Sequence, residues 1–172
     1  MAGKRASTRA GPKIELHSKK IMLCVWWAVH GVIFWELLPP AVTVNSGIYR
    51  AQLDKLEAEV RKMRPQHEKI YFLHDNARPH VSKLTRNKIL EQGWEVLPHP
   101  PYSPDLAPTD YHLFRSLGNS LRDKKFDDAN DIQKYLTDFF ASQSRDFCAN
   151  GIRSLPTRWQ MVVDNGGAYI ID

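Results

Sequence analysis

The chain has 172 residues, 42% of them apolar, which is enough for one domain with its own core. No apolar run approaches the roughly eighteen residues that a membrane-spanning helix needs, and the first twenty residues carry no signal-peptide pattern. We therefore expect no membrane partner. Cys24 and Cys148 lie far apart in apolar surroundings, without metal-ligand spacing, and are predicted to be free thiols of a reducing compartment.

The net charge of +5 is concentrated at one end of the chain. Residues 1–20 contain a single acidic residue, Glu15, against the basic residues Lys4, Arg5, Arg9, Lys13, Lys19 and Lys20, so the remaining residues sum to zero. We predict a basic, disordered arm over residues 1–19 that can contact phosphates, followed by a folded domain over residues 20–172. The alternative is that the arm has no role.

The first part of the predicted domain is a hairpin followed by a helix. Two apolar runs, Ile21–Trp27 and Val32–Leu38, are close enough to pair as antiparallel strands, the first of them buried on both faces. Asn45 or Ser46 is placed to cap a helix that Pro65 ends. The apolar stripe of this helix is typical of core packing and consists of Tyr49, Leu53, Leu56, Val60 and Met63.

The middle of the chain predicts a strand, a helix, a second strand and a stiff loop. The short apolar run 70–73 predicts a buried strand, and a helix follows from Pro79 to Gln92, stopped by Gly93. Residues 94–97 predict a short strand. The loop from Pro98 to Pro108 contains five prolines, and within it Asp105 is predicted to be a turn residue. Further helices are predicted over Asp110–Leu121, over a segment begun by Asp127–Asp128, in a shorter piece ended by Gly151, and over Pro156–Val163.

Two aspartates stand at positions that suit a divalent metal. Asp75 follows the strand at 70–73, and the carboxyl ends of strands form the ligand-binding edge of open α/β sheets. Asp110 shares a predicted helix face with Phe114, Leu117 and Leu121, where an unpaired charge is costly. Two converging carboxylates would bind a hard divalent cation and, without it, would repel each other and raise one pKa. The alternative is that Asp110 is an ordinary helix cap.

The residues around this pair resemble one family. HDNARPH at 74–80, HPPYSPDLAPTDYHLF at 99–114 and KKIMLCVWW at 19–27 resemble the mariner family of DNA transposases, and the resemblance runs from about Lys19 to Tyr169. It implies a ribonuclease H-like α/β domain, a mixed sheet flanked by helices, with three metal-binding aspartates. Thirty-four residues separate Asp75 from Asp110, which matches the family's second and third aspartates. The first is expected on a central strand that lies upstream of this segment.

The resemblance also implies roles for individual residues. Asp75 and Asp110 would be the catalytic ligands of a two-metal Mg²⁺ or Mn²⁺ site, incomplete here, which activates the attacking oxygen at phosphorus and stabilises the leaving one. His74 and Asn76 would support these ligands. DNA would be held by a basic stretch whose members are Arg78, His80, Lys83, Arg86 and Lys88, although a solvated helix face is the alternative. A nuclear location and no small-molecule substrate are expected.

Two interpretations of function follow from the missing first strand. One is a transposase catalytic-domain fragment, related to metal-dependent DNA cleavage and strand transfer, with little or no activity by itself. The other is a non-catalytic module that binds DNA or protein. In both, the strands at 21–27 and 70–73 have open edges, so we expect a homodimer, aggregation or direct pairing of the two strands. A third interpretation, outside the resemblance, is an unrelated nuclease or a metal-free structural domain.

Overall fold

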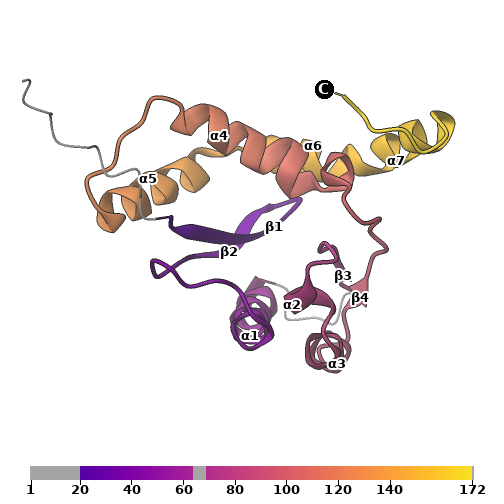
Figure 1. The fold of residues 1–172 in the computed structure, drawn as a ribbon, viewed down its shortest axis with the longest axis horizontal. Coiled ribbons are helices and arrows are strands. Elements are labelled where there is room, and N and C mark those ends of the chain that lie inside the picture. The colour runs from indigo at the N-terminus through magenta and orange to yellow at the C-terminus, as the bar shows by residue number, and fades with distance from the viewer. Residues whose placement is uncertain (1–19, 64–68, 172) are drawn as a thin grey trace, which may run out of the picture.

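A central antiparallel hairpin divides the molecule into two halves. The computed structural model describes residues 20–63 and 69–171, so the predicted arm at 1–19 and Pro65 lie outside the described residues. β1 (Met22–Ala28) and β2 (Gly31–Leu38) pair in antiparallel register, with a bulge between Trp26 and Trp27. The predicted hairpin is confirmed. In Figure 1 the helices α4 to α7 lie on one side of this hairpin, and α1, α2 and α3 lie on the other with β3 and β4.

The predicted helix after the hairpin is confirmed as α1 (Ser46–Met63). Its first turn is capped by Asn45, whose Oδ1 accepts a hydrogen bond of 2.9 Å from the backbone N–H of Ile48. Tyr49, Leu53 and Leu56 are buried as the stripe predicts, whereas Met63 at the end of the helix is 54% exposed. The buried side chains form a first core with Phe72, Ile89 and Trp94.

The middle segment forms a small parallel sheet with a broken helix between its strands. β3 (Tyr71–Phe72) and β4 (Glu95–Val96) pair in parallel. The single helix predicted from Pro79 to Gln92 is wrong in one respect: α2 (Arg78–Val81) and α3 (Lys83–Glu91) are separate. The chain is extended at Ser82, which caps α3 by accepting a hydrogen bond from the backbone N–H of Thr85. Ser82, a residue type favoured at helix N-termini, thus starts a new helix and interrupts the predicted single helix.

The second half of the fold is helical and packs on the other face of the hairpin. After the 3₁₀ turn η1 (Pro104–Leu106) come a π-helical segment η2 (Thr109–Phe114) and the helices α4 (Arg115–Leu121), α5 (Ala129–Ser142), α6 (Arg145–Arg153) and α7 (Leu155–Asp164). Leu113, Leu117, Leu136 and Phe140 form a second core here. None of the helices in the described ranges is long and apolar enough to cross a membrane.

Apolar clusters cover both faces of β1, as predicted, but its side chains are only half-buried. Leu23, Val25 and Trp27 pack against the second core, and Trp26 packs against the first. One edge of β1 has no partner strand among the described residues, and no neighbouring strand covers its side chains there. Within the described ranges β1 pairs only with β2, and β3 only with β4.

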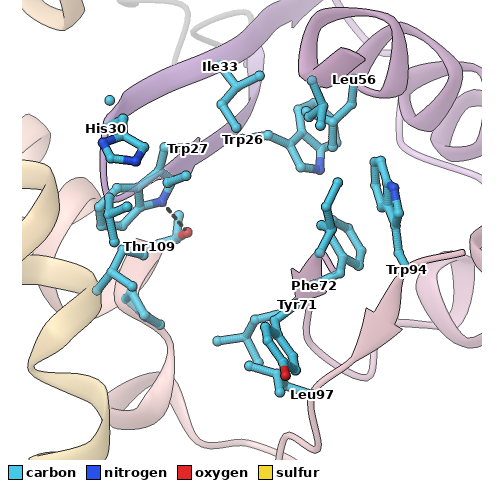
Figure 2. A pocket seen from close by; sticks show the side chains of 18 of the residues that line it. Trp26, Trp27, His30, Ile33, Leu56, Tyr71, Phe72, Trp94, Leu97 and Thr109 are labelled. Atoms are coloured by element: carbon cyan, nitrogen blue, oxygen red, sulfur yellow. Dashed lines mark hydrogen bonds between the residues drawn. The ribbon is translucent and has the colours of Figure 1, made fainter. Parts of the chain in front are cut away.

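The two sheets are separated by an apolar groove of about 350 Å³. Figure 2 shows Trp26 and Trp27 of β1 on one side of it and Tyr71 and Phe72 of β3 on the other. The strands do not close the gap by pairing directly. Over the described residues the fold is therefore a mixed α/β architecture with two separate two-stranded sheets, and a groove lies between them where a central strand was expected.

Candidate metal-binding and DNA-binding site

Asp75 and Asp110 line one cleft of about 370 Å³. Asp75 lies three positions after the last residue of β3, beyond the carboxyl end of the strand, as predicted. Asp110 lies at the second position of η2. His74, His80 and His99 line the same cleft. The structure therefore brings together the two carboxylates that the sequence singled out.

Asp110 is held by contacts between its helical segment and the rest of the fold. The indole Nε1 of Trp27 donates a hydrogen bond of 3.0 Å to Oγ1 of Thr109, which ties β1 to the residue before Asp110. Tyr111, on the other side, donates a hydrogen bond of 2.8 Å from its hydroxyl to the carbonyl of Gly151 in α6. These contacts fix the backbone on both sides of the carboxylate.

Gly151 permits this arrangement because it has no side chain. A Cβ at this position would lie 2.4 Å from the His112 ring and 2.9 Å from the Trp27 ring. The His112 ring itself donates a hydrogen bond of 2.8 Å to the carbonyl of Phe147. Gly151 lies within α6, so the prediction that it ends this helix was wrong; its function is to allow close packing.

The prediction that Asp110 lies on the core-facing stripe was also wrong. Leu113 and Leu117 are the buried residues of this stretch, and Asp110 is exposed to the cleft. The π-helical hydrogen bonding of η2 changes the angular spacing of side chains, so the regular α-helical pattern does not hold at its start. Phe114 and Leu121 do pack against the second core, as predicted.

The electrostatics of the two aspartates differ. Desolvation by the cleft walls, followed by repulsion from Asp75, raises the pKa of Asp110 above its usual range, while His99 opposes the shift. Partial burial alone would also raise the pKa of Asp75, but the hydrogen bond from the Ala77 N–H and the effects of His80 outweigh it and lower that pKa. The repulsion expected of a converging carboxylate pair is therefore present.

The predicted supporting residues make specific contacts. His74 Nδ1 lies 3.0 Å from the hydroxyl of Tyr49. Desolvation and the neighbouring His80 lower the pKa of His74 to about 4, so its ring is neutral at pH 7 and accepts the tyrosine's hydrogen. Asn76 donates a hydrogen bond of 2.8 Å to the carbonyl of His99, which joins the end of β3 to the loop after β4.

The residues predicted to hold DNA lie in different environments. Arg78, Lys83 and Arg86 are exposed on α2 and α3. Lys88 forms an ion pair with Asp54 of α1, and His80 is hydrogen-bonded to Asp75. The charge available on this surface is thus smaller than the sequence alone implies.

Two residues make long-range contacts that sequence patterns did not indicate. Tyr49 was predicted only as a core residue, yet its hydroxyl reaches His74. Asp105, predicted as a turn residue, is 8% exposed, and its Oδ2 accepts a hydrogen bond of 3.1 Å from the backbone N–H of Ile170. Both contacts join segments far apart in the sequence, for which a local pattern carries no signal.

A divalent cation is compatible with the donor set of this cleft, because two oxygen-bearing carboxylates line it and repel each other. Over residues 20–63 and 69–171, however, no group of three potential ligand side chains converges. The described part of the chain therefore provides a two-carboxylate site.

Comparisons with known proteins identify what the chain is similar to. A family described as "Transposase (partial DDE domain)" matches residues 2–70. The Mariner Mos1 transposase of Drosophila mauritiana is 42% identical over 172 residues, which covers 98% of this chain and 49% of that protein. The human histone-lysine N-methyltransferase SETMAR is 44% identical over 161 residues, covering 92% of this chain and 24% of that protein. The chain thus spans about half the length of the first relative and about a quarter of the second.

The chain is also similar to solved structures of Mos1 transposase. The crystal structure of the catalytic domain of Mos1 mariner transposase superposes with a TM-score of 0.87 at 44% identity, covering 89% of this chain and 77% of that one. The crystal structure of the Mos1 mariner paired end complex with Mn superposes with a TM-score of 0.88 at 43% identity, covering 98% of this chain and 50% of that one. The similarity extends over nearly all of this chain.

Proposed function

This chain belongs to the mariner family of DNA transposases and corresponds to a part of the catalytic domain, and from that premise we propose that its cleft binds a divalent metal ion and DNA phosphates. The observation that carries the proposal is that Asp75 and Asp110 line one cleft, where desolvation and then repulsion from Asp75 raise the pKa of Asp110. A bound Mg²⁺ or Mn²⁺ would neutralise this charge and supply Lewis-acid activation of an oxygen at phosphorus.

The chain's own residues would hold and orient the reacting groups. Asp75 and Asp110 supply the oxygen ligands. Arg78, Lys83 and Arg86 are exposed on α2 and α3, the helices that follow Asp75, and suit contacts to the DNA backbone. Asn76 fixes the distance between the end of β3 and the loop that leads to Asp110. Catalysis in such a site depends on positioning and electrostatics more than on covalent chemistry by the protein.

We expect cleavage by this chain alone to be very slow. Two carboxylates hold a metal pair less firmly than three, and the described residues provide only two that converge. The same observation favours the second candidate function, a non-catalytic module that binds DNA. The two candidates share metal-dependent DNA binding and differ in whether a strand is cut.

The experiment is DNA binding and nicking with and without Mn²⁺. We expect Mn²⁺ to strengthen binding of duplex DNA, Asp75→Asn and Asp110→Asn to remove that increase, and a supercoiled plasmid to remain intact. An absence of any Mn²⁺ effect on binding would contradict the proposed site. Nicking that requires both aspartates would show that the chain is an active enzyme and would point to a further ligand, with Glu15 as the first candidate.

A further inference from the structure

Asp75 accepts two hydrogen bonds on the same carboxylate oxygen. The backbone N–H of Ala77 donates to Oδ1 at 2.9 Å, and Nδ1 of His80 lies 2.6 Å from the same atom. A carboxylate oxygen accepts hydrogen bonds, so Nδ1 of His80 carries the hydrogen in this contact. Both bonds converge on Oδ1 and leave Oδ2 as the oxygen that can face a cation.

The imidazole that makes this contact is itself fixed by two other rings. The His80 ring centroid lies 4.1 Å from that of Tyr49 and 5.4 Å from that of His74, with an angle of 7° to the His74 plane. Tyr49 is a core residue of α1, with 4% exposure. The orientation of His80 is therefore set by the packed core and not by solvent.

We propose that His80 is a positioning residue that holds the Asp75 carboxylate in the orientation needed to bind the metal ion through Oδ2. This inference rests on the proposed metal site. The terminal torsion of an aspartate is broad and roughly two-fold, so a single hydrogen bond leaves the two oxygens free to exchange. Two donors on one oxygen restrict that rotation. Partners that orient metal-binding carboxylates typically contribute 10–100-fold to metal affinity.

A role in capping α2 does not account for the contact. The Ala77 N–H bond to Asp75 already satisfies a backbone donor at the start of this helix, and a second bond from a side chain satisfies none. A direct role in holding DNA, which the sequence suggested for His80, is disfavoured by the same geometry. Nδ1 is occupied by Asp75, and the ring packs against Tyr49 and His74.

The test is the affinity of the metal-free chain for Mn²⁺, measured from the electron paramagnetic resonance signal of the free ion. Phenylalanine at position 80 keeps a ring for stacking but removes the donor, so H80F should lower Mn²⁺ affinity by about 10–100-fold. Asparagine presents its amide near the place of Nδ1, so H80N should retain most of the affinity. Glutamine presents it near Nε2 instead, so H80Q should behave like H80F.

Two controls make the outcome decisive. His30 is exposed in the turn between β1 and β2, and H30F should leave affinity unchanged. D75N reports whether the site exists: if it does not reduce Mn²⁺ binding, the proposed function fails and this inference with it. If D75N removes binding but H80F binds as the parent chain does, the role of His80 alone is refuted. Should H80F not fold, equal affinities of H80N and H80Q would refute it.

Discussion

The proposed metal site predicts how Asp110→Asn changes the stability of the protein with and without Mn²⁺. The pKa of Asp110 is raised in the folded state, so its ionisation lowers the free energy of unfolding. The protonated carboxyl favours the fold at low pH, and this stabilisation is lost as pH rises through the raised pKa. At pH 7 the substitution removes a repelled charge, so the metal-free protein should be as stable as the parent or slightly more stable. Solvent exposure of the side chain keeps the gain small.

With Mn²⁺ present, the parent chain should instead be more stable than Asp110→Asn. An ion that binds only the folded state adds about 2.7 kcal/mol at a concentration of 100 times its dissociation constant. For a chain of this size that corresponds to a rise in melting temperature of roughly 5–11 °C. Asp110→Asn should lose this rise, because it removes one of the two carboxylates that line the cleft.

The assay is thermal unfolding followed by circular dichroism at pH 7, with and without millimolar Mn²⁺. Asp138→Asn is the matched control, because Asp138 is exposed on α5 and does not line the cleft. It should keep the full Mn²⁺ response. The reasoning is refuted if Asp110→Asn responds to Mn²⁺ as strongly as the control does, since the ion would then bind elsewhere.

Three further predictions concern packing, DNA contacts and the open strand edges. Gly151→Ala should destabilise the fold by about 1–3 kcal/mol in urea unfolding, because the new Cβ would overlap the His112 and Trp27 rings. Gly118→Ala is the control: a Cβ at Gly118 would have no neighbouring atom within 4 Å, so this variant should not be destabilised. Equal stabilities of these two variants would show that α6 can move away. Replacing Lys83 and Arg86 by alanine should reduce the slope of log affinity for duplex DNA against log salt by about 2, measured by fluorescence anisotropy, and an unchanged slope would remove these residues from the DNA surface. Among the described residues β1 and β3 each have one edge without a partner strand, so the chain should associate as concentration rises, and a monomer at every concentration in sedimentation velocity would contradict this.

Much of the fold could be predicted because local patterns in this chain agree with the tertiary structure. The hairpin, the capped α1 with its buried stripe and a strand before Asp75 each follow from residue spacing within one segment. That strand is shorter than the predicted 70–73, and Tyr71 is 58% exposed, so the prediction that it is buried was wrong there. The break at Ser82 and the π-helical start at Asp110 could not be predicted in this way. Both depend on hydrogen bonding that competes with the regular helix, and apolar periodicity does not report it.

The sequence predicted the two carboxylates that line the candidate site, but it did not predict the contacts that support them. Asp75 and Asp110 were found from their places after a strand and at a helix start, together with the motifs around them. The hydrogen bond between Tyr49 and His74 joins α1 to the end of β3. The bond between Trp27 and Thr109 spans eighty-two positions. Such contacts arise only once the two halves of the molecule pack together.

The central claim, that Asp75 and Asp110 hold one divalent metal site, is tested most directly by a crystal structure of this chain grown with Mn²⁺, using anomalous scattering to locate the metal. We predict an anomalous peak in the cleft, coordinated by oxygens of both carboxylates, with Oδ2 of Asp75 as the ligand and Oδ1 still bonded to His80. A peak bound by other residues, or none in this cleft at saturating Mn²⁺, would contradict the claim.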